Sequence, residues 1–206
     1  MTKPVDTSDG TRRLAGAPIS WGVCEVPGWG LQLPPERVLA EMAGLGLTAT
    51  ELGPQGWLPP DGGRARAVLD RFGLRLVGGF VPVVVHESDL SSTRESALRA
   101  GEQLAALGAD VFVAALVQDV DWAAPVPLGE DGWRRAGVHL RELAGLVAEQ
   151  GLTLVLHPHV GTLAETAQDV ERALVHTDVP WCLDTGHLLI GGVDPVRFVR
   201  DHADRI

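Results

Sequence analysis

The stretch LVLHPHVGT, residues 154–162, joins a buried strand to a polar end that could carry chemistry. Its first part is an apolar run of Leu and Val, which is typical of a strand inside a parallel sheet. Two histidines that flank a proline follow at once, and a glycine comes next. Because side chains alternate along an extended chain, we expect His157 and His159 to point to the same side. Two imidazoles in one place indicate a metal site or a proton acceptor.

The same alternation of apolar runs and segments of helical periodicity extends to both sides of this stretch. The predicted strands lie near residues 15–21, 47–53, 74–85, 109–116, 152–157 and 179–184. The predicted helices cover residues 33–46, 63–72, 91–108, 131–151, 162–176 and 194–206, and the serines at the start of the third can cap it. Strands separated by helices must pair in parallel, so the pattern predicts an α/β fold.

Two α/β architectures compete, an open doubly wound sheet and a (β/α) barrel. No predicted strand is followed by GxGxxG or GxxxxGK[ST], so the usual nucleotide-binding motifs of an open sheet are missing. Polar residues instead follow the carboxyl ends of several strands, which is typical of a barrel. These residues are Glu25, Glu51, His86, His157, His159, Asp184 and His187.

The number of predicted units falls short of a complete barrel. A (β/α)8 TIM barrel has eight units and about 250 residues, whereas this chain of 206 residues has six predicted units. We therefore expect a barrel truncated to about six βα units, in a domain over residues 14–206 that is incomplete at its C-terminus. Residues 1–13 are polar and are predicted to form a disordered tail.

Composition narrows the class of partner. A formal net charge of -10 argues against nucleic acid and anionic membranes, because both need a basic surface. No apolar run is long enough to span a membrane or to serve as a signal peptide. Cys24 and Cys182 are isolated, which favours two reduced, buried thiols over a disulfide framework or a zinc knuckle. We expect a cytoplasmic protein with a small-molecule substrate, and a homo-oligomer stays open.

The segment CLDTGH, residues 182–187, is the second candidate for chemistry. Asp184 ends an apolar strand, and His187 follows across a turn that Gly186 makes easy. A carboxylate and an imidazole placed in this way suit a metal ion, or an acid and a base. The structural alternative is that Asp184 only caps the next helical turn and His187 packs. For His157 and His159 the alternative is that they only form hydrogen bonds with each other and with nearby backbone groups at the strand end.

Further candidates come from the first half of the chain. Glu51 follows an apolar strand and would meet the barrel mouth, or would pair with an arginine on a helix. The stretch SWGVCEVPGWG, residues 20–30, offers Trp21, Glu25 and Trp29 on a loop that could stack on a sugar or cyclitol ring or exclude water. A loop packed by its own tryptophans is the alternative. His86 could contact substrate or lie in a solvated loop.

Five motifs together resemble a known family: PISWGVCEVPGWG, ATELGP, VGGFVPVVVH, LHPHVGT and CLDTGHLLIGG. From about Ala15 to the end, the chain is similar to the xylose isomerase-like TIM-barrel superfamily of sugar isomerases and epimerases, and within it to the inosose dehydratase branch. The resemblance implies a divalent metal at the C-terminal mouth of the barrel. It matches Asp184 to a metal ligand and His187 to a histidine that touches substrate, while His157 takes the place of a metal-binding glutamate.

The imidazole in place of a carboxylate changes what the resemblance implies. It removes a negative charge and leaves a softer ligand, which favours manganese or cobalt, with magnesium and zinc as alternatives. It also removes one of two carboxylates that the sugar epimerases use as proton acceptors. The implied activity is a metal-dependent carbon–oxygen lyase that acts on inosose, 2-keto-myo-inositol, in inositol catabolism. A ketose or sugar-phosphate isomerase or epimerase, and a non-catalytic sugar-binding barrel or inactive fragment, are the alternatives.

Each candidate residue has an expected role. His157 and Asp184 are the predicted metal ligands. His187 or His159 is the predicted base, and Glu51 is expected to orient substrate hydroxyls, which completes the predicted catalytic set. The residues expected to bind substrate are Trp21, Glu25, Trp29 and His86.

Overall fold

The computed structural model of the chain describes residues 14–26 and 28–206, so the predicted N-terminal tail lies outside the described residues. The helices and strands, with η for a 3-10 helix, are in chain order η1 Pro18–Trp21, α1 Pro35–Gly44, β1 Ala49–Glu51, α2 Gly62–Arg71, β2 Arg75–Val83, α3 Ser91–Ala106, β3 Val111–Leu116, α4 Glu130–Ala148, β4 Thr153–Leu156, α5 Ala167–His176, α6 Thr185–Ile190, α7 Pro195–His202 and η2 Ala203–Arg205. Strands and helices alternate through most of the chain, as the sequence predicts.

The four strands form one parallel sheet in the order β1-β2-β3-β4. Isolated parallel bridges extend this series on both sides, from Gly16 to Thr50 of β1 and from Leu156 of β4 to Trp181. Each segment therefore lies beside its predecessor, whereas a doubly wound sheet reverses its strand order at a switch point. The winding is that of part of a (β/α) barrel, and the prediction of a barrel over an open sheet is confirmed.

The strands predicted over residues 15–21 and 179–184 are wrong in their extent, because each is reduced to one bridged residue. Proline explains both. Pro18 starts η1 two residues after the bridge at Gly16. Pro180 has no N–H to donate to a ladder, and the helix that begins after Asp184 ends the extended segment soon after Trp181.

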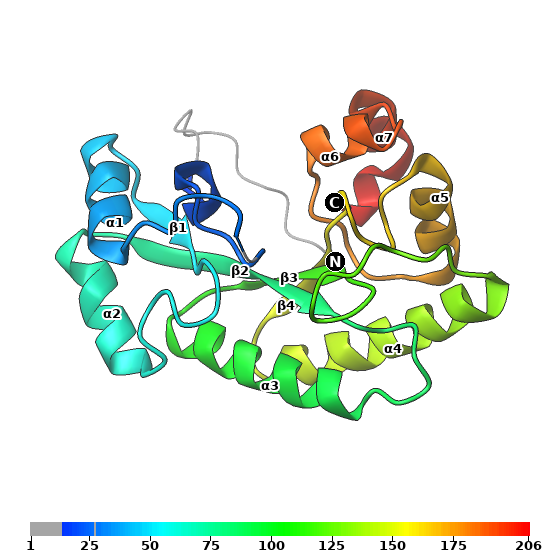
Figure 1. Cartoon of the computed structure of the whole chain (residues 1–206), viewed down its shortest axis with the longest axis horizontal. Helices are drawn as coiled ribbons and strands as arrows, with labels where there is room; N and C mark the ends of the chain where they lie inside the picture. Colours follow the sequence, from blue (N-terminus) through cyan, green and yellow to red (C-terminus); the bar gives the residue numbers. More distant parts are fainter. Residues whose placement is uncertain (1–13, 27) are drawn as a thin grey trace.

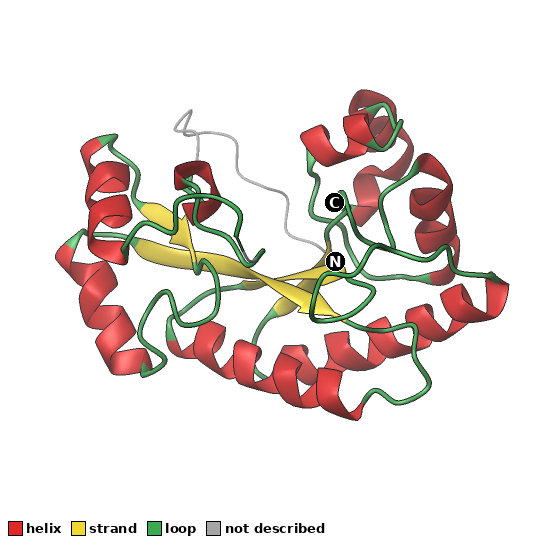
Figure 2. Ribbon diagram, viewed as in Figure 1, coloured by secondary structure: helices red, strands yellow, loops and turns green. Residues whose placement is uncertain are grey.

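Helices α3 and α4 run along the same face of the sheet, with α1 and α2 toward one end of the molecule and α5, α6 and α7 toward the other (Figures 1 and 2). Leu140, Leu143 and Val147 recur at helical spacing on α4 and are fully buried. Burying a side chain of this size contributes about 1.5–3 kcal/mol. The core between the sheet and these helices therefore fixes the strands whose ends carry the candidate site.

Helix ends follow the sequence signals in most places. Gly46 and Gly108, expected to end α1 and α3, take the left-handed conformation with φ of 81° and 71°. The expected serine cap of α3 is wrong, because Leu90 occupies the N-cap position. Ser91 already lies inside the helix, and its N–H donates to Asp89 Oδ1 at 2.9 Å. Within the described residues, none of the helices combines the length and apolarity that crossing a membrane requires.

Candidate functional site

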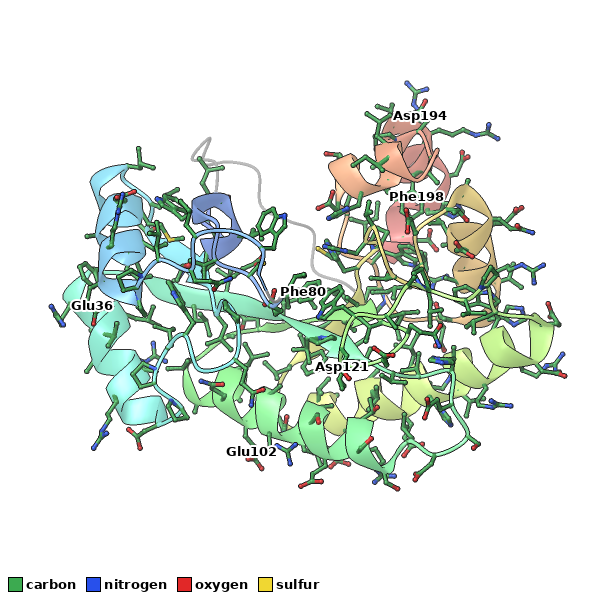
Figure 3. The ribbon with its side chains drawn as sticks, viewed as in Figure 1. Glu36, Phe80, Glu102, Asp121, Asp194 and Phe198 are labelled. Atoms are coloured by element: carbon green, nitrogen blue, oxygen red, sulfur yellow. The ribbon has the colours of Figure 1, made fainter. Side chains whose placement is uncertain are left out.

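The face of the sheet turned away from α3 carries the candidate residues. A Cβ on Gly79 would lie 3.0 Å from Leu104 of α3, so the neighbouring Phe80 points to the other face. Figure 3 shows Phe80 above the sheet, on the side opposite α3 and α4. Its partners in register are Val113 of β3 and Val155 of β4, and His157 lies two residues beyond Val155. His157 therefore shares the face of Phe80, and the two ring centroids are 5.7 Å apart.

Three histidines meet at this face. The ring centroids of His157 and His159 are 5.5 Å apart, and His187 of α6 lies 5.5 Å from His157 and 4.0 Å from His159. Each ring offers one nitrogen, and these atoms all lie within 4.8 Å of one another. The expectation that His157 and His159 point the same way is confirmed, although β4 ends at Leu156. The protein thus has a histidine cluster that could hold a metal ion.

The peptide of Val160 fixes the protons of two of these rings. His159 Nδ1 lies 2.6 Å from the Val160 carbonyl oxygen, and the imidazole must donate because a carbonyl only accepts. The Val160 N–H donates to His187 Nδ1 at 3.4 Å. In the neutral rings, His159 Nε2 therefore has a free lone pair and His187 Nε2 carries the hydrogen. The two rings therefore offer opposite hydrogen-bonding groups, an acceptor on His159 and a donor on His187.

His157 has the properties of a metal ligand. Its side chain is only 9% exposed, and its Nδ1 is buried without a hydrogen-bond partner among the residues that the structure describes. Burial, and then the neighbouring His159, lower the pKa of His157 to about 4. The ring is therefore uncharged near neutral pH, which is the form that binds metals. Burial also lowers the pKa of His159, with a further contribution from His187.

Asp184 caps α6, as the structural alternative has it, because its Oδ1 accepts from the His187 N–H at 2.7 Å. This hydrogen bond places the His187 backbone next to the cluster. The negative charge of Asp184 also partly offsets the lowering of the His157 and His159 pKa values. The nitrogen cluster itself consists of His157, His159 and His187, so a ligand role for Asp184 stays a prediction.

Two glutamates from the first units influence the same region. Burial raises the pKa of Glu51, and the charge of Glu25 raises it further. Burial likewise raises the pKa of Glu25. The pKa of the half-buried Cys182 is raised to about 11 by burial and then by the charges of Glu51 and Asp184. Glu51 lies on β1 and Cys182 follows β4, which are the two edge strands of the sheet. A charge from one edge of the sheet therefore affects the pKa of a thiol at the other edge.

Of the other residues expected to bind substrate, Trp21 and His86 have hydrogen-bond partners within the protein, and Trp29 is exposed. The Trp21 indole donates to Glu41 of α1 at 2.7 Å, and Trp29 is 54% exposed. His86 Nε2 accepts from Gln118 Nε2 at 3.1 Å, and burial lowers the pKa of His86. Substrate contacts of these three side chains stay predictions.

Sequence reasoning missed two aromatic residues of the site, Phe80 and Trp122. Their ring planes are inclined by only 10°, with centroids 6.1 Å apart. Both rings also lie beside His159, at 5.6 Å and 6.0 Å. Strand alternation could have assigned Phe80 to the face of His157. No periodicity identifies Trp122, because it lies in the irregular connection between β3 and α4.

Curated relatives and solved structures resemble the chain over most of its length. The inosose dehydratase of Geobacillus kaustophilus (strain HTA426) is 33% identical over 207 residues, which cover 94% of this chain and 67% of that protein. The curated relatives compared are covered over 61% to 70% of their own length, so the chain spans about two thirds of them.

Two solved structures share the fold. The probable 3-DHS dehydratase AsbF of Bacillus anthracis has a TM-score of 0.70 at 15% identity, over 95% of this chain and 71% of that one. An L-ribulose 3-epimerase has a TM-score of 0.71 at 18% identity, over 95% and 68% of the respective chains. The profile of the xylose isomerase-like TIM barrel family matches residues 39–206. The sequential strand order and the polar residues at the strand ends agree with this match. The chain belongs to the xylose isomerase-like TIM barrel family.

Proposed function

We propose that the protein is a metal-dependent carbon–oxygen lyase that removes water from a cyclic polyol ketone of the inosose type. The observation that carries this proposal is the pair His159 and His187, whose hydrogen bonds to Val160 leave one ring as acceptor and the other as donor. Removal of water from a ketone needs both functions at adjacent carbons. The similarity to a protein named inosose dehydratase supports the same reaction class.

The chemistry of the donor set fits a divalent metal, manganese or cobalt first and magnesium or zinc as alternatives. His157 would hold the ion with an uncharged buried ring whose Nδ1 has no other partner among the described residues. Asp184 would contribute a carboxylate oxygen beside it. When bound, the ion would supply polarisation of the ketone, which makes the neighbouring C–H more acidic.

The protein residues would move the protons. His159 Nε2 takes the proton from the carbon next to the ketone, and the electrons of that C–H bond form the new C=C bond. The C–O bond at the following carbon breaks while His187 Nε2–H donates a hydrogen bond to the departing oxygen, and the proton held by His159 passes to that oxygen, so that one water leaves and both rings end neutral. Glu51 would hold substrate hydroxyls in position, since its carboxylate oxygens can accept hydrogen bonds from them.

A ketose or sugar-phosphate epimerase is the second candidate, and the similarity to an L-ribulose 3-epimerase favours it. Purified full-length protein would be loaded with Mn²⁺ and incubated with inosose and, separately, with ketoses. Dehydration forms a dione whose ultraviolet absorbance rises, whereas epimerisation leaves the absorbance unchanged. An absorbance rise with inosose supports the lyase, and turnover of ketoses alone would overturn it. Turnover of neither class would leave the sugar-binding alternative.

Asp184→Asn tests the site with a matched control. Asparagine caps a helix about as well as aspartate, so this variant should fold normally and lose its metal-dependent turnover. Asp194 caps α7 in the same manner, with its Oδ1 accepting from the Val196 and Arg197 N–H groups. Asp194→Asn should therefore keep both stability and turnover. Full activity in Asp184→Asn would remove Asp184 from the proposed metal site.

A further inference from the structure

The connection between β3 and α4 holds Trp122 in an unusual backbone conformation. Its φ is 61°, and Gln32 is the only other non-glycine residue with positive φ in the described part of the chain. A bulky side chain rarely adopts this left-handed region. Such a conformation costs free energy and persists only where its surroundings hold it, which is common at functional sites.

Asp119 holds this conformation. Its Oδ1 accepts from the backbone N–H groups of Asp121 and Ala123, each at 3.0 Å. Its carbonyl oxygen accepts from the Trp122 N–H at 3.3 Å. The donors of these three hydrogen bonds are Trp122 itself and the residues directly before and after it. Asp119 is thus the residue that fixes the turn.

Gln118 ties the same connection to the rest of the fold. Its Oε1 accepts from the Val126 N–H at 2.9 Å, and its Nε2 donates to His86 at 3.1 Å. The His86 carbonyl oxygen in turn accepts from Arg135 of α4 at 2.8 Å. Hydrogen bonds therefore connect the turn around Trp122 to His86 and, through His86, to α4. These contacts hold the Trp122 ring in its position.

The strained turn places the indole against the site. The Trp122 ring lies nearly parallel to Phe80 and 6.0 Å from His159, the proposed base. Phe80 also lies 5.6 Å from His159. Two aromatic rings in nearly parallel planes thus lie beside the imidazole of His159. They form an apolar surface next to the polar histidines.

We propose that Phe80 and Trp122 form an aromatic wall that binds the C–H face of a cyclic polyol, and that Asp119 is the positioning residue that holds Trp122 in this wall. The inference rests on the proposed function, which brings a ring to His159. A saturated six-membered ring with equatorial hydroxyls exposes C–H bonds on its faces and oxygens at its rim. Flat aromatic side chains match such a face.

The test compares four variants of the full-length protein loaded with Mn²⁺. Trp122→Gly removes the ring and relieves the positive φ, so KM for inosose should rise about tenfold or more while the thermal midpoint stays the same or rises. Asp119→Ala should raise KM similarly with the indole present. Asp119→Asn keeps an oxygen acceptor at the Oδ1 position and should restore most of the affinity. Asp121→Ala, at an exposed residue of the same turn labelled in Figure 3, is the control and should behave like the wild type.

Binding of myo-inositol, followed by calorimetry, provides a readout that does not depend on turnover. The wild type should bind this unreactive cyclitol, and Trp122→Gly and Asp119→Ala should bind it about tenfold more weakly or worse. Unchanged KM and unchanged cyclitol binding in both variants would overturn this inference alone, while wild-type dehydration of inosose still supports the lyase. A Trp122→Gly protein that is less stable with unchanged KM would show that Trp122 only packs. Wild-type protein that binds no cyclitol and turns over only ketoses would overturn both proposals.

Discussion

At the scale of single residues, one peptide unit decides how two histidines can act. The Val160 carbonyl oxygen accepts a hydrogen bond from His159 Nδ1–H, and the Val160 N–H donates a hydrogen bond to His187 Nδ1. The side chain of Val160 takes no part in either hydrogen bond. Backbone groups, and not a side chain, therefore determine the proton positions on which the proposed elimination depends.

Val160→Pro isolates one of these two hydrogen bonds. The Thr162 N–H donates to the His159 carbonyl at 3.2 Å, and Gly161 has a φ of 77°, as in a type II turn with Val160 at the position that favours proline. The variant should keep the turn and the bond to His159 but lose the donor to His187. We expect kcat to fall about tenfold, the value of one hydrogen bond, with KM nearly unchanged.

The proton position itself can be measured by ¹⁵N NMR of the imidazole nitrogens, where His187 should lose its preference for hydrogen on Nε2. Val160→Ala keeps the whole peptide and should match the wild type in both measurements. Equal kcat in the wild type and Val160→Pro would contradict the assigned roles.

The thiol of Cys182 reports the charges around the site. Because its pKa is raised to about 11, the thiolate is scarce at pH 8, and alkylation by iodoacetamide should be slow and should accelerate about tenfold per pH unit up to pH 10. Glu51→Gln removes a negative charge that disfavours the thiolate, so it should lower this pKa and speed the labelling. Glu102→Gln changes an exposed residue of α3 and should have no effect. Mass spectrometry of the labelled peptide measures each rate, and identical rates for the two variants would refute the coupling of Glu51 to Cys182.

Among the site residues, those that end strands could be predicted and those in irregular turns could not. His157 and His159 follow an apolar run, so alternation along the chain predicts their common direction. Trp122 is placed by the side chain of Asp119 and by a positive φ, and neither leaves a periodic signal. The roles of His159 and His187 were open for the same reason, because sequence does not show which backbone groups meet their rings.

At the scale of elements, the crossing of α4 and α5 depends on a missing side chain. A Cβ on Gly137 of α4 would lie 2.0 Å from the His176 carbonyl oxygen at the end of α5. No shift of a flexible side chain could relieve that overlap, because the obstacle is backbone. The helices can approach this closely only with glycine at this position.

Gly137→Ala should therefore lower the free energy of unfolding by about 3 kcal/mol, as overpacking of a core does. Gly145 lies on the same helix, where a Cβ would meet nothing within 4 Å. Gly145→Ala should instead raise the free energy of unfolding by about 0.5–1 kcal/mol, since alanine favours the helix. Urea unfolding followed by circular dichroism measures both changes. A similar midpoint for the two variants would disprove the close crossing.

The elements that sequence predicts well are those with a clear period and a clear end. The apolar spacing of α4 and the left-handed glycines after α1 and α3 fix these helices from local information. The strands at residues 15–21 and 179–184 were overestimated because apolar composition says nothing about available hydrogen-bond donors. Proline at positions 18 and 180 decides how far each can pair.

At the scale of the whole molecule, the proposed metal site should couple to stability. An ion that binds the folded chain alone stabilises it by about 2.7 kcal/mol at a concentration one hundred times its dissociation constant. Addition of Mn²⁺ or Co²⁺ should thus raise the thermal midpoint by several degrees, and a chelator should reverse the rise. His157→Asn should abolish this response, whereas His202→Asn, at a histidine of α7 whose tilted ring lies 5.0 Å from that of Phe198, should retain it. A midpoint insensitive to all divalent metals would contradict the proposed site.

The two segments that carry the histidines are also linked to each other. The Gly161 N–H donates to Glu165 Oε2 at 2.7 Å, and the Ala167 N–H at the start of α5 donates to the Gly191 carbonyl oxygen after α6 at 2.8 Å. A Cβ on Gly191 would lie 1.9 Å from the Glu165 carbonyl oxygen, so the backbones are in close contact there. Residues 157–165 and 184–191 are consequently expected to open together as one unit of native-state fluctuation. Their amide hydrogens should exchange with solvent at a common opening free energy, and the geometry of the three imidazoles would then be lost or kept as a whole.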